Sequence, residues 1–87
     1  MHEFTLMADL LKKIERIAKE NDSDRVLSVS VKLGALSHIS PGHFREHFEH
    51  AIEGTVAEGA ELEVEQLTDE SSPQAGDILL DSVEVAQ

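Results

Sequence analysis

The first three residues carry groups that together could bind one transition-metal ion. In Met1-His2-Glu3 the α-amine, the backbone amide of His2 and the His2 imidazole can all reach the same metal. A set of amine, amide and imidazole nitrogens is planar, which suits square-planar Ni(II) or Cu(II) better than tetrahedral zinc. This chemistry needs an unextended terminus, and the bulky residue at position 2 is expected to hinder removal of Met1. Histidine at position 2 has this potential in any protein, so spacing alone does not establish a site.

Three further histidines recur at i, i+4 and i+7 in a segment of helical periodicity: His43, His47 and His50. Side chains at this spacing project from one side of a helix, where they can chelate a divalent metal. The same residues flank a stripe of two phenylalanines, so a half-buried position at the core boundary also explains them. Because no aspartate or cysteine completes a ligand set, the sequence favours this simpler interpretation.

Composition excludes several classes of protein. The 87 residues suit a single domain, and the absence of cysteine excludes disulfides, thiolate zinc sites, iron–sulfur clusters and a cysteine nucleophile. A net charge of −11 argues against binding to nucleic acid. We find no apolar run near the roughly 18–20 residues of a membrane span and no signal peptide, and therefore expect a soluble, cytoplasmic domain. Without a nucleophile–base pair or a phosphate-binding glycine loop, an enzyme is not expected.

The charge is concentrated in the second half of the chain. Residues 51–87 contain ten acidic side chains and no lysine or arginine, and Arg45 is the last cation. A solvated face is the simpler interpretation, and a docking surface for a basic partner is the functional one. Adaptation to high salt would produce the same pattern.

The hydrophobic pattern predicts the elements that carry these residues. From Thr5, the expected N-cap, to Glu20 the apolar residues follow the 3.6-residue period of a helix. Residues 25–33 alternate with period two, as in a strand with one face on the core. A second helix is expected from Ser40-Pro41 to Glu53, a strand over 60–67, a polar loop over 68–77 and a last strand over 78–85. The predicted core-facing sets are Leu6, Leu10, Ile14, Ile17 and Ala18; Leu27, Val29, Val31 and Leu33; and Phe44, Phe48, Ala51 and Ile52.

This order of elements predicts an α+β fold for the whole chain, residues 1–87, as one domain. Two helices should pack on one face of a small mixed sheet of three to four strands, giving two layers. The last two strands, joined by a polar loop, should form an antiparallel hairpin. A short strand at residues 2–4 could pair at one edge of the sheet.

Several segments resemble one protein family, over residues 1–67 nearly without gaps and again at the end. They are Met1 to Leu6, Val29 to Ser37, scattered positions from Pro41 to Thr55, Ala57 to Leu62, and Asp81 to Val85. Together they resemble the HypA/HybF family, nickel metallochaperones for the maturation of nickel–iron hydrogenase and, in some bacteria, urease. The opening Met-His-Glu is the most specific part of the resemblance.

The resemblance implies a nickel carrier rather than an enzyme. Ni(II) would be held by the Met1 amine, the His2 imidazole and the backbone amides of His2 and Glu3, with the Glu3 side chain in support. His38 could add a ligand, although an exposed loop position explains it equally. The implied partners are the maturation GTPase HypB and the hydrogenase large subunit, with no nucleic acid and no membrane.

Two features depart from the family pattern. Relatives carry a zinc-binding module with two CxxC pairs between the last two strands, where this chain has the polar loop 68–77 and no cysteine, so no zinc is expected. Ala35 also stands where relatives often carry glutamate. A natural shortened paralogue and an engineered deletion would look alike. The alternative function is therefore a zinc-less paralogue that acts as a protein-interaction or regulatory module, with a vestigial nickel site.

Overall fold

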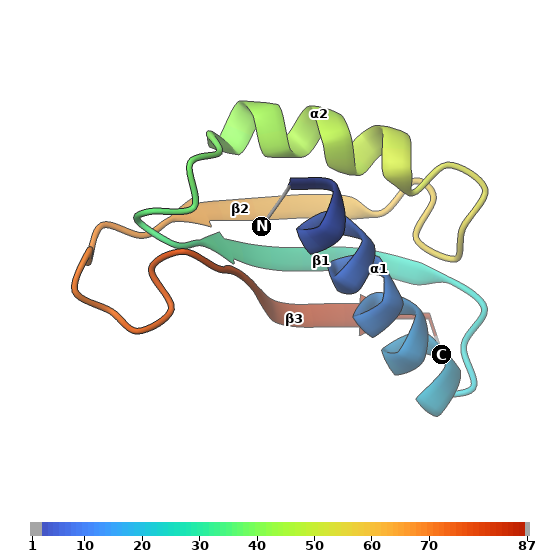
Figure 1. The fold of residues 1–87 in the computed structure, drawn as a ribbon. Coiled ribbons are helices and arrows are strands. Elements are labelled where there is room, and N and C mark those ends of the chain that lie inside the picture. Colours follow the sequence, from blue (N-terminus) through green and yellow to red (C-terminus); the bar gives the residue numbers. More distant parts are fainter. Residues whose placement is uncertain (1–2, 87) are drawn as a thin grey trace.

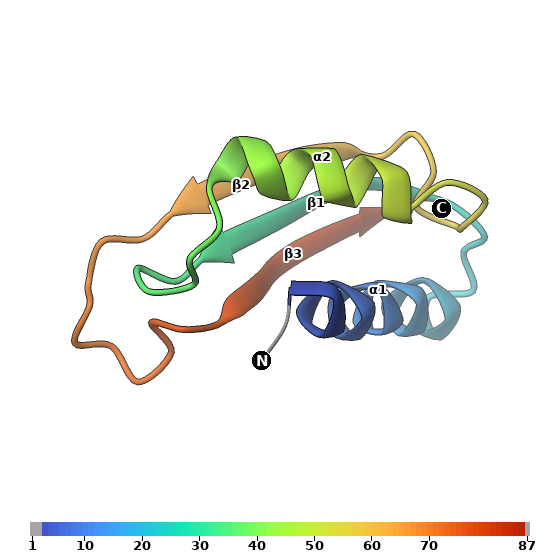
Figure 2. The ribbon, with the colours of Figure 1, turned by 45° about the horizontal axis from the view of Figure 1, so that its top comes forward.

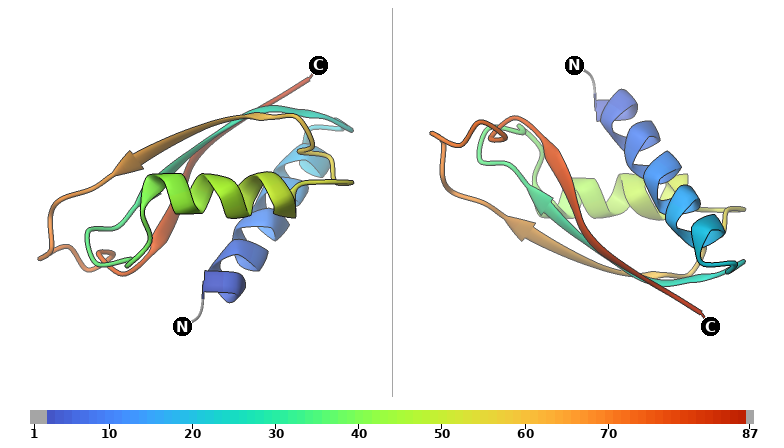
Figure 3. Two further views of the ribbon diagram at one scale, coloured as in Figure 1. Left: turned by 90° about the horizontal axis from the view of Figure 1, so that it is seen from above. Right: turned by 90° about the horizontal axis from the view of Figure 1, so that it is seen from below.

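Two helices and three strands make up the fold in the computed structural model, which describes residues 3–86, with side chains from Met7 onward. They are α1 (Glu3–Glu20), β1 (Val26–Leu33), α2 (Pro41–Ala51), β2 (Glu61–Gln66) and β3 (Ile78–Val85). Both helices lie on the same face of the sheet (Figures 1 and 3), so the predicted two-layer α+β architecture is confirmed. Within residues 3–86, neither helix has the length and apolar character required to cross a membrane.

The start of the chain differs from the prediction. α1 begins at Glu3, two residues before the expected N-cap Thr5. Residues 3 and 4 are helical, so the short edge strand proposed there is wrong, and the sheet has three strands.

The sheet has the order β2-β1-β3, with β1 at its centre. β1 pairs in parallel with β2, where Val29 lies opposite Leu62, and antiparallel with β3, where Val29 lies opposite Val83. α2 forms the crossover that a parallel pair requires. β2 and β3 therefore lie on opposite sides of β1, and the predicted antiparallel hairpin between them is wrong.

Charge on the outer face of the sheet explains why β1 separates the other two strands. The three glutamates of β2 and the two acidic residues of β3 are all exposed. Like charges directly opposite one another on adjacent strands are destabilising. β1 places small polar groups and a cation between the two acidic rows, with Lys32 opposite Glu65 and its Nζ 3.8 Å from Asp81 Oδ1.

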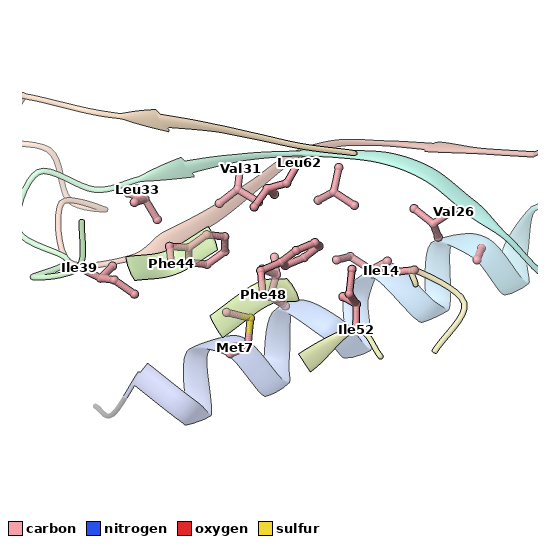
Figure 4. Close-up of a cluster of buried hydrophobic side chains, with 14 residues drawn as sticks. Met7, Ile14, Val26, Val31, Leu33, Ile39, Phe44, Phe48, Ile52 and Leu62 are labelled. Carbon is pink, nitrogen blue, oxygen red and sulfur yellow. The ribbon is translucent and has the colours of Figure 1, made fainter. Parts of the chain in front are cut away.

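The hydrophobic core fills the space between the sheet and the two helices (Figure 4). The Phe44 and Phe48 rings of α2 are fully buried and stack with their centroids 6.0 Å apart. Burying an aromatic or aliphatic side chain of this size contributes about 1.5–3 kcal/mol. The predicted helical stripes are confirmed for the buried residues Leu10, Ile14, Ala18, Phe44, Phe48 and Ile52.

One residue at the start of β1 was assigned to the wrong face. Leu27 was predicted to face the core but is 38% exposed, whereas Val26 is 1% exposed. The pairing of β1 with β3 shifts register between Val26 and Ser28. Such an irregularity breaks the strict alternation of faces, which is why the period-two pattern misplaced Leu27.

The connection from β2 to β3 crosses the carboxyl end of β1 (Figures 1 and 2). The Gly34 amide donates to the Asp77 carbonyl at 2.8 Å, and the Leu36 amide donates to the Ala75 carbonyl at 2.7 Å. A Cβ built on Gly34 would lie 2.2 Å from the Ala75 oxygen. Only glycine allows the two backbones to approach this closely.

We expect Gly34→Ala to lower the free energy of unfolding by about 1–3 kcal/mol, because the added methyl must push the Ala75 carbonyl away. Gly42 is the matched control, since nothing lies within 4 Å of a Cβ built there and alanine is favoured in a helix. Urea denaturation followed by circular dichroism measures both variants. A free energy of unfolding for Gly34→Ala equal to that of the unsubstituted chain would contradict the close packing at Gly34.

Candidate functional site

The predicted N-terminal site stands next to the start of α1 in the sequence. Met1 and His2 lie outside the described residues, as does the side chain of Glu3. Met7, one helical turn after Glu3, is 6% exposed and belongs to the same buried cluster as Phe48 of α2 (Figure 4). Met7 therefore ties the second turn of α1 into the core that it shares with α2.

His38 lies in the loop between β1 and α2, and its side chain is exposed. Its φ of 61° falls in the left-handed region that residues other than glycine seldom adopt. The same loop is held to the β2–β3 connection by the bond from the Leu36 amide to Ala75. The contribution of His38 to a metal site stays a prediction.

The beginning of α2 is capped as the sequence predicted. The Ser40 hydroxyl accepts a hydrogen bond from the His43 amide at 3.2 Å, and Pro41 occupies the first turn. The helix ends at Ala51, slightly before the predicted Glu53, and Gly54 follows with a φ of 77°. The cap fixes where α2 starts and therefore which way its histidines point.

Two of the three helical histidines meet. The Nε2 atoms of His43 and His47 are 2.9 Å apart, with ring centroids separated by 4.6 Å. His50 instead places Nδ1 3.8 Å from the Glu53 carboxylate. The i, i+4 spacing indicated a shared side of the helix, but this contact depends on side-chain rotamers that spacing does not specify. Among the side chains described, no three His, Cys, Asp or Glu residues form a ligand cluster.

Arg45 anchors the other flank of α2. Its Nη2 donates a hydrogen bond to the Leu62 carbonyl of β2 at 3.0 Å. The buried Phe44 and Phe48 lie between this flank and the histidine pair on the helical circuit. α2 is thus held in place by its core face and by Arg45. The opposite flank carries the two imidazole rings of His43 and His47.

The polar loop 68–77 has a defined conformation. Asp69 Oδ1 accepts hydrogen bonds from the Ser71 hydroxyl at 2.6 Å and from the Ser71 amide at 3.0 Å. Because both bonds stabilise the charged carboxylate, they lower the pKa of Asp69 below its ordinary value. At the base of the loop, the Gln66 side-chain amide donates to the Leu33 and Gly34 carbonyls, each at 3.2 Å.

Known proteins resemble this chain over most of its length. Residues 1–72 match the family model described as "Hydrogenase/urease nickel incorporation, metallochaperone, hypA". The chain belongs to the HypA family. A hydrogenase maturation factor HypA from Aquifex aeolicus is 45% identical over 69 residues, which are 77% of this chain and 60% of the relative. A hydrogenase maturation factor HybF from Shigella boydii is 38% identical over 64 residues, covering 74% of this chain and 57% of the relative.

Two solved HypA structures share the fold. The solution structure of the Ni metallochaperone HypA from Helicobacter pylori superimposes with a TM-score of 0.79 at 22% identity, covering 98% of this chain and 97% of that one. A second HypA solution structure gives a TM-score of 0.75, also at 22% identity, covering 99% and 97%. The matched residues span about 60% of the length of the HypA proteins from Aquifex aeolicus and Rhizobium leguminosarum.

We predict that Ser71→Ala raises the pKa of Asp69 toward its ordinary value, because the largest cause of the lowering is the Ser71 hydroxyl. A carboxylate with a lowered folded-state pKa adds stability above its unfolded-state pKa and loses it as pH falls through the folded value. An NMR pH titration of the Asp69 carboxyl measures the shift. Ser72→Ala is the control, since the Ser72 hydroxyl accepts from Gln74. An identical Asp69 titration in both variants would refute this assignment.

Proposed function

We propose that this chain is a nickel carrier that binds Ni(II) at Met1-His2-Glu3 and delivers it for the maturation of nickel–iron hydrogenase. The observation that carries the proposal is the match of residues 1–72, which includes this motif, to a family described by nickel incorporation. The ligands are the Met1 amine, the His2 imidazole and the backbone amides of His2 and Glu3, supported by the Glu3 carboxylate. His38, in the β1–α2 loop, is proposed as an additional ligand outside the plane of these four nitrogens.

Nickel binding at these atoms is coupled to the loss of protons. The amine and imidazole bind metal only in their neutral forms, and the backbone amides bind only after deprotonation. Affinity therefore falls as pH decreases. Four nitrogen donors in a plane favour low-spin Ni(II), and release follows when a recipient supplies competing ligands. This carrier needs no catalytic group, and without cysteine it has no thiolates for structural zinc.

The proposed recipients are the maturation GTPase HypB and the hydrogenase large subunit. The outer face of the sheet supports docking of a basic surface, since it presents the glutamates of β2 and the acidic residues of β3. This face lies opposite the helices (Figure 3). A partner bound there would leave the helical side accessible for exchange of the metal.

We expect the chain to bind about one Ni(II) in a planar, low-spin site that His2→Ala or acetylation of the Met1 amine abolishes, because each change removes one proposed ligand. Titration of the visible absorption of planar nickel reports this site and its stoichiometry. His50→Ala is the matched control, since His50 is a histidine of α2 whose imidazole lies beside the Glu53 carboxylate and is not a proposed ligand. Retention of the planar signal in both the His2→Ala and the acetylated chains would rule out this ligand set.

Capture of binding partners from native extract distinguishes the carrier function from the alternative of a regulatory module. The chain, tagged at its carboxyl end so that the Met1 amine is unblocked, is expected to recover hydrogenase-maturation proteins from native extract, and the recovery should weaken with salt because the docking face is acidic. Mass spectrometry identifies the proteins, and elemental analysis measures nickel. Recovery of an unrelated enzyme, with no nickel in the isolated chain, would support the regulatory module instead.

A further inference from the structure

Two histidines of α2 place potential metal-ligating nitrogens side by side. His43 and His47 lie one turn apart on α2, with their Nε2 atoms 2.9 Å apart and their rings inclined at 59°. At this separation one ring nitrogen donates and the other accepts, depending on the tautomer. When the donor ring carries its proton on Nδ1 instead, both Nε2 atoms have a free lone pair and can bind one metal ion. Histidines at i and i+4 on a helix are an established arrangement for holding one ion.

The nitrogen–nitrogen distance indicates which ions fit. Two nitrogens that each lie about 2.05 Å from a metal are about 2.9 Å apart at a right angle and about 3.3 Å apart at the tetrahedral angle. The observed 2.9 Å therefore matches adjacent positions of a square-planar or octahedral ion. Ni(II) and Cu(II) prefer these geometries, whereas tetrahedral zinc would require the rings to spread apart.

The pair is held by a rigid element and is open to solvent. The Ser40 cap fixes the start of α2, and the buried rings of Phe44 and Phe48 fix its core face. His43 is exposed and His47 is half-buried, so an ion from solvent can reach both rings. Ligands that are already positioned lose little conformational freedom on binding.

The pair faces the side of the molecule where α1 begins. At 100° per residue, His43 and His47 each lie about 160° around α2 from Arg45, which points to β2. The histidine flank is therefore turned away from β2, toward the side on which α1 runs (Figures 2 and 3). Met7 of α1 and Phe48 of α2 belong to the same buried cluster.

We propose that His43 and His47 form a second Ni(II) site, a bis-imidazole chelate on α2. It uses none of the N-terminal ligands and so goes beyond the carrier function proposed above. A chelate of two imidazole nitrogens binds Ni(II) more weakly than a set of four nitrogens. It can therefore take up an ion first and give it to stronger ligands.

The test uses the full chain with His2→Ala, which removes the N-terminal imidazole, and NiCl₂ as the probe. Calorimetry is expected to show about one Ni(II) per chain, and a further His47→Ala or His43→Ala change to weaken binding by at least about tenfold. His50→Ala in the same background should change nothing, because His50 lies outside the pair. Paramagnetic broadening of amide resonances should centre on α2.

Equal nickel affinity with and without His47→Ala, or broadening centred away from α2, would overturn the proposal. His47→Gln keeps a polar side chain of similar length, and thermal melting checks that each variant is folded. The planar nickel absorption of the unsubstituted chain reports the N-terminal site separately. A failure of the helical site and a failure of the carrier function are therefore distinguishable.

Discussion

β1 forms contacts through both of its edges and both of its faces, and these contacts position the other strands and the helices. One edge accepts β2 in parallel and the other accepts β3 in antiparallel. The inner face presents Val29 and Val31, each almost fully buried, to the helices. The outer face presents Ser30 and Lys32 between two acidic rows. Hydrogen bonding, apolar burial and charge separation thus act through the same eight residues, and the position of the helices follows from them.

α2 connects this frame to the chemistry of the domain. Its core face anchors it through two stacked phenylalanines, one flank is held to β2 by Arg45, and the other flank carries the imidazole pair. Because three sides of one short helix have three separate roles, the two side chains that could hold a metal ion are positioned by residues that never contact it. The same core includes Met7, in the second turn of α1.

The sequence predicted the two helices and the cap of α2, whose causes are local. It did not predict strand order or the facing of Leu27, which depend on pairing with strands far along the chain. The stripe through Leu10 and Ile14 and the cap at Ser40 were read correctly, because their physical causes lie within one helix. The hairpin failed because loop length does not reveal which strand occupies the centre of a sheet. Leu27 was misplaced because a register shift arises from pairing with β3. For the helical histidines, spacing placed the side chains on one side, while the 2.9 Å approach required the packed structure.

Both ends of the β2–β3 connection are hydrogen-bonded to the end of β1. The Leu67 amide donates to the Leu33 carbonyl at 2.8 Å, and the Gly34 amide donates to the Asp77 carbonyl at 2.8 Å. They are thus held about two strand spacings, roughly 10 Å, apart whatever chain runs between them. Since loop-closure entropy grows only slowly with length, a whole folded unit can replace the polar loop here without re-pairing any strand. This junction is therefore a point where evolution can add or remove a module while the rest of the domain continues to fold as before.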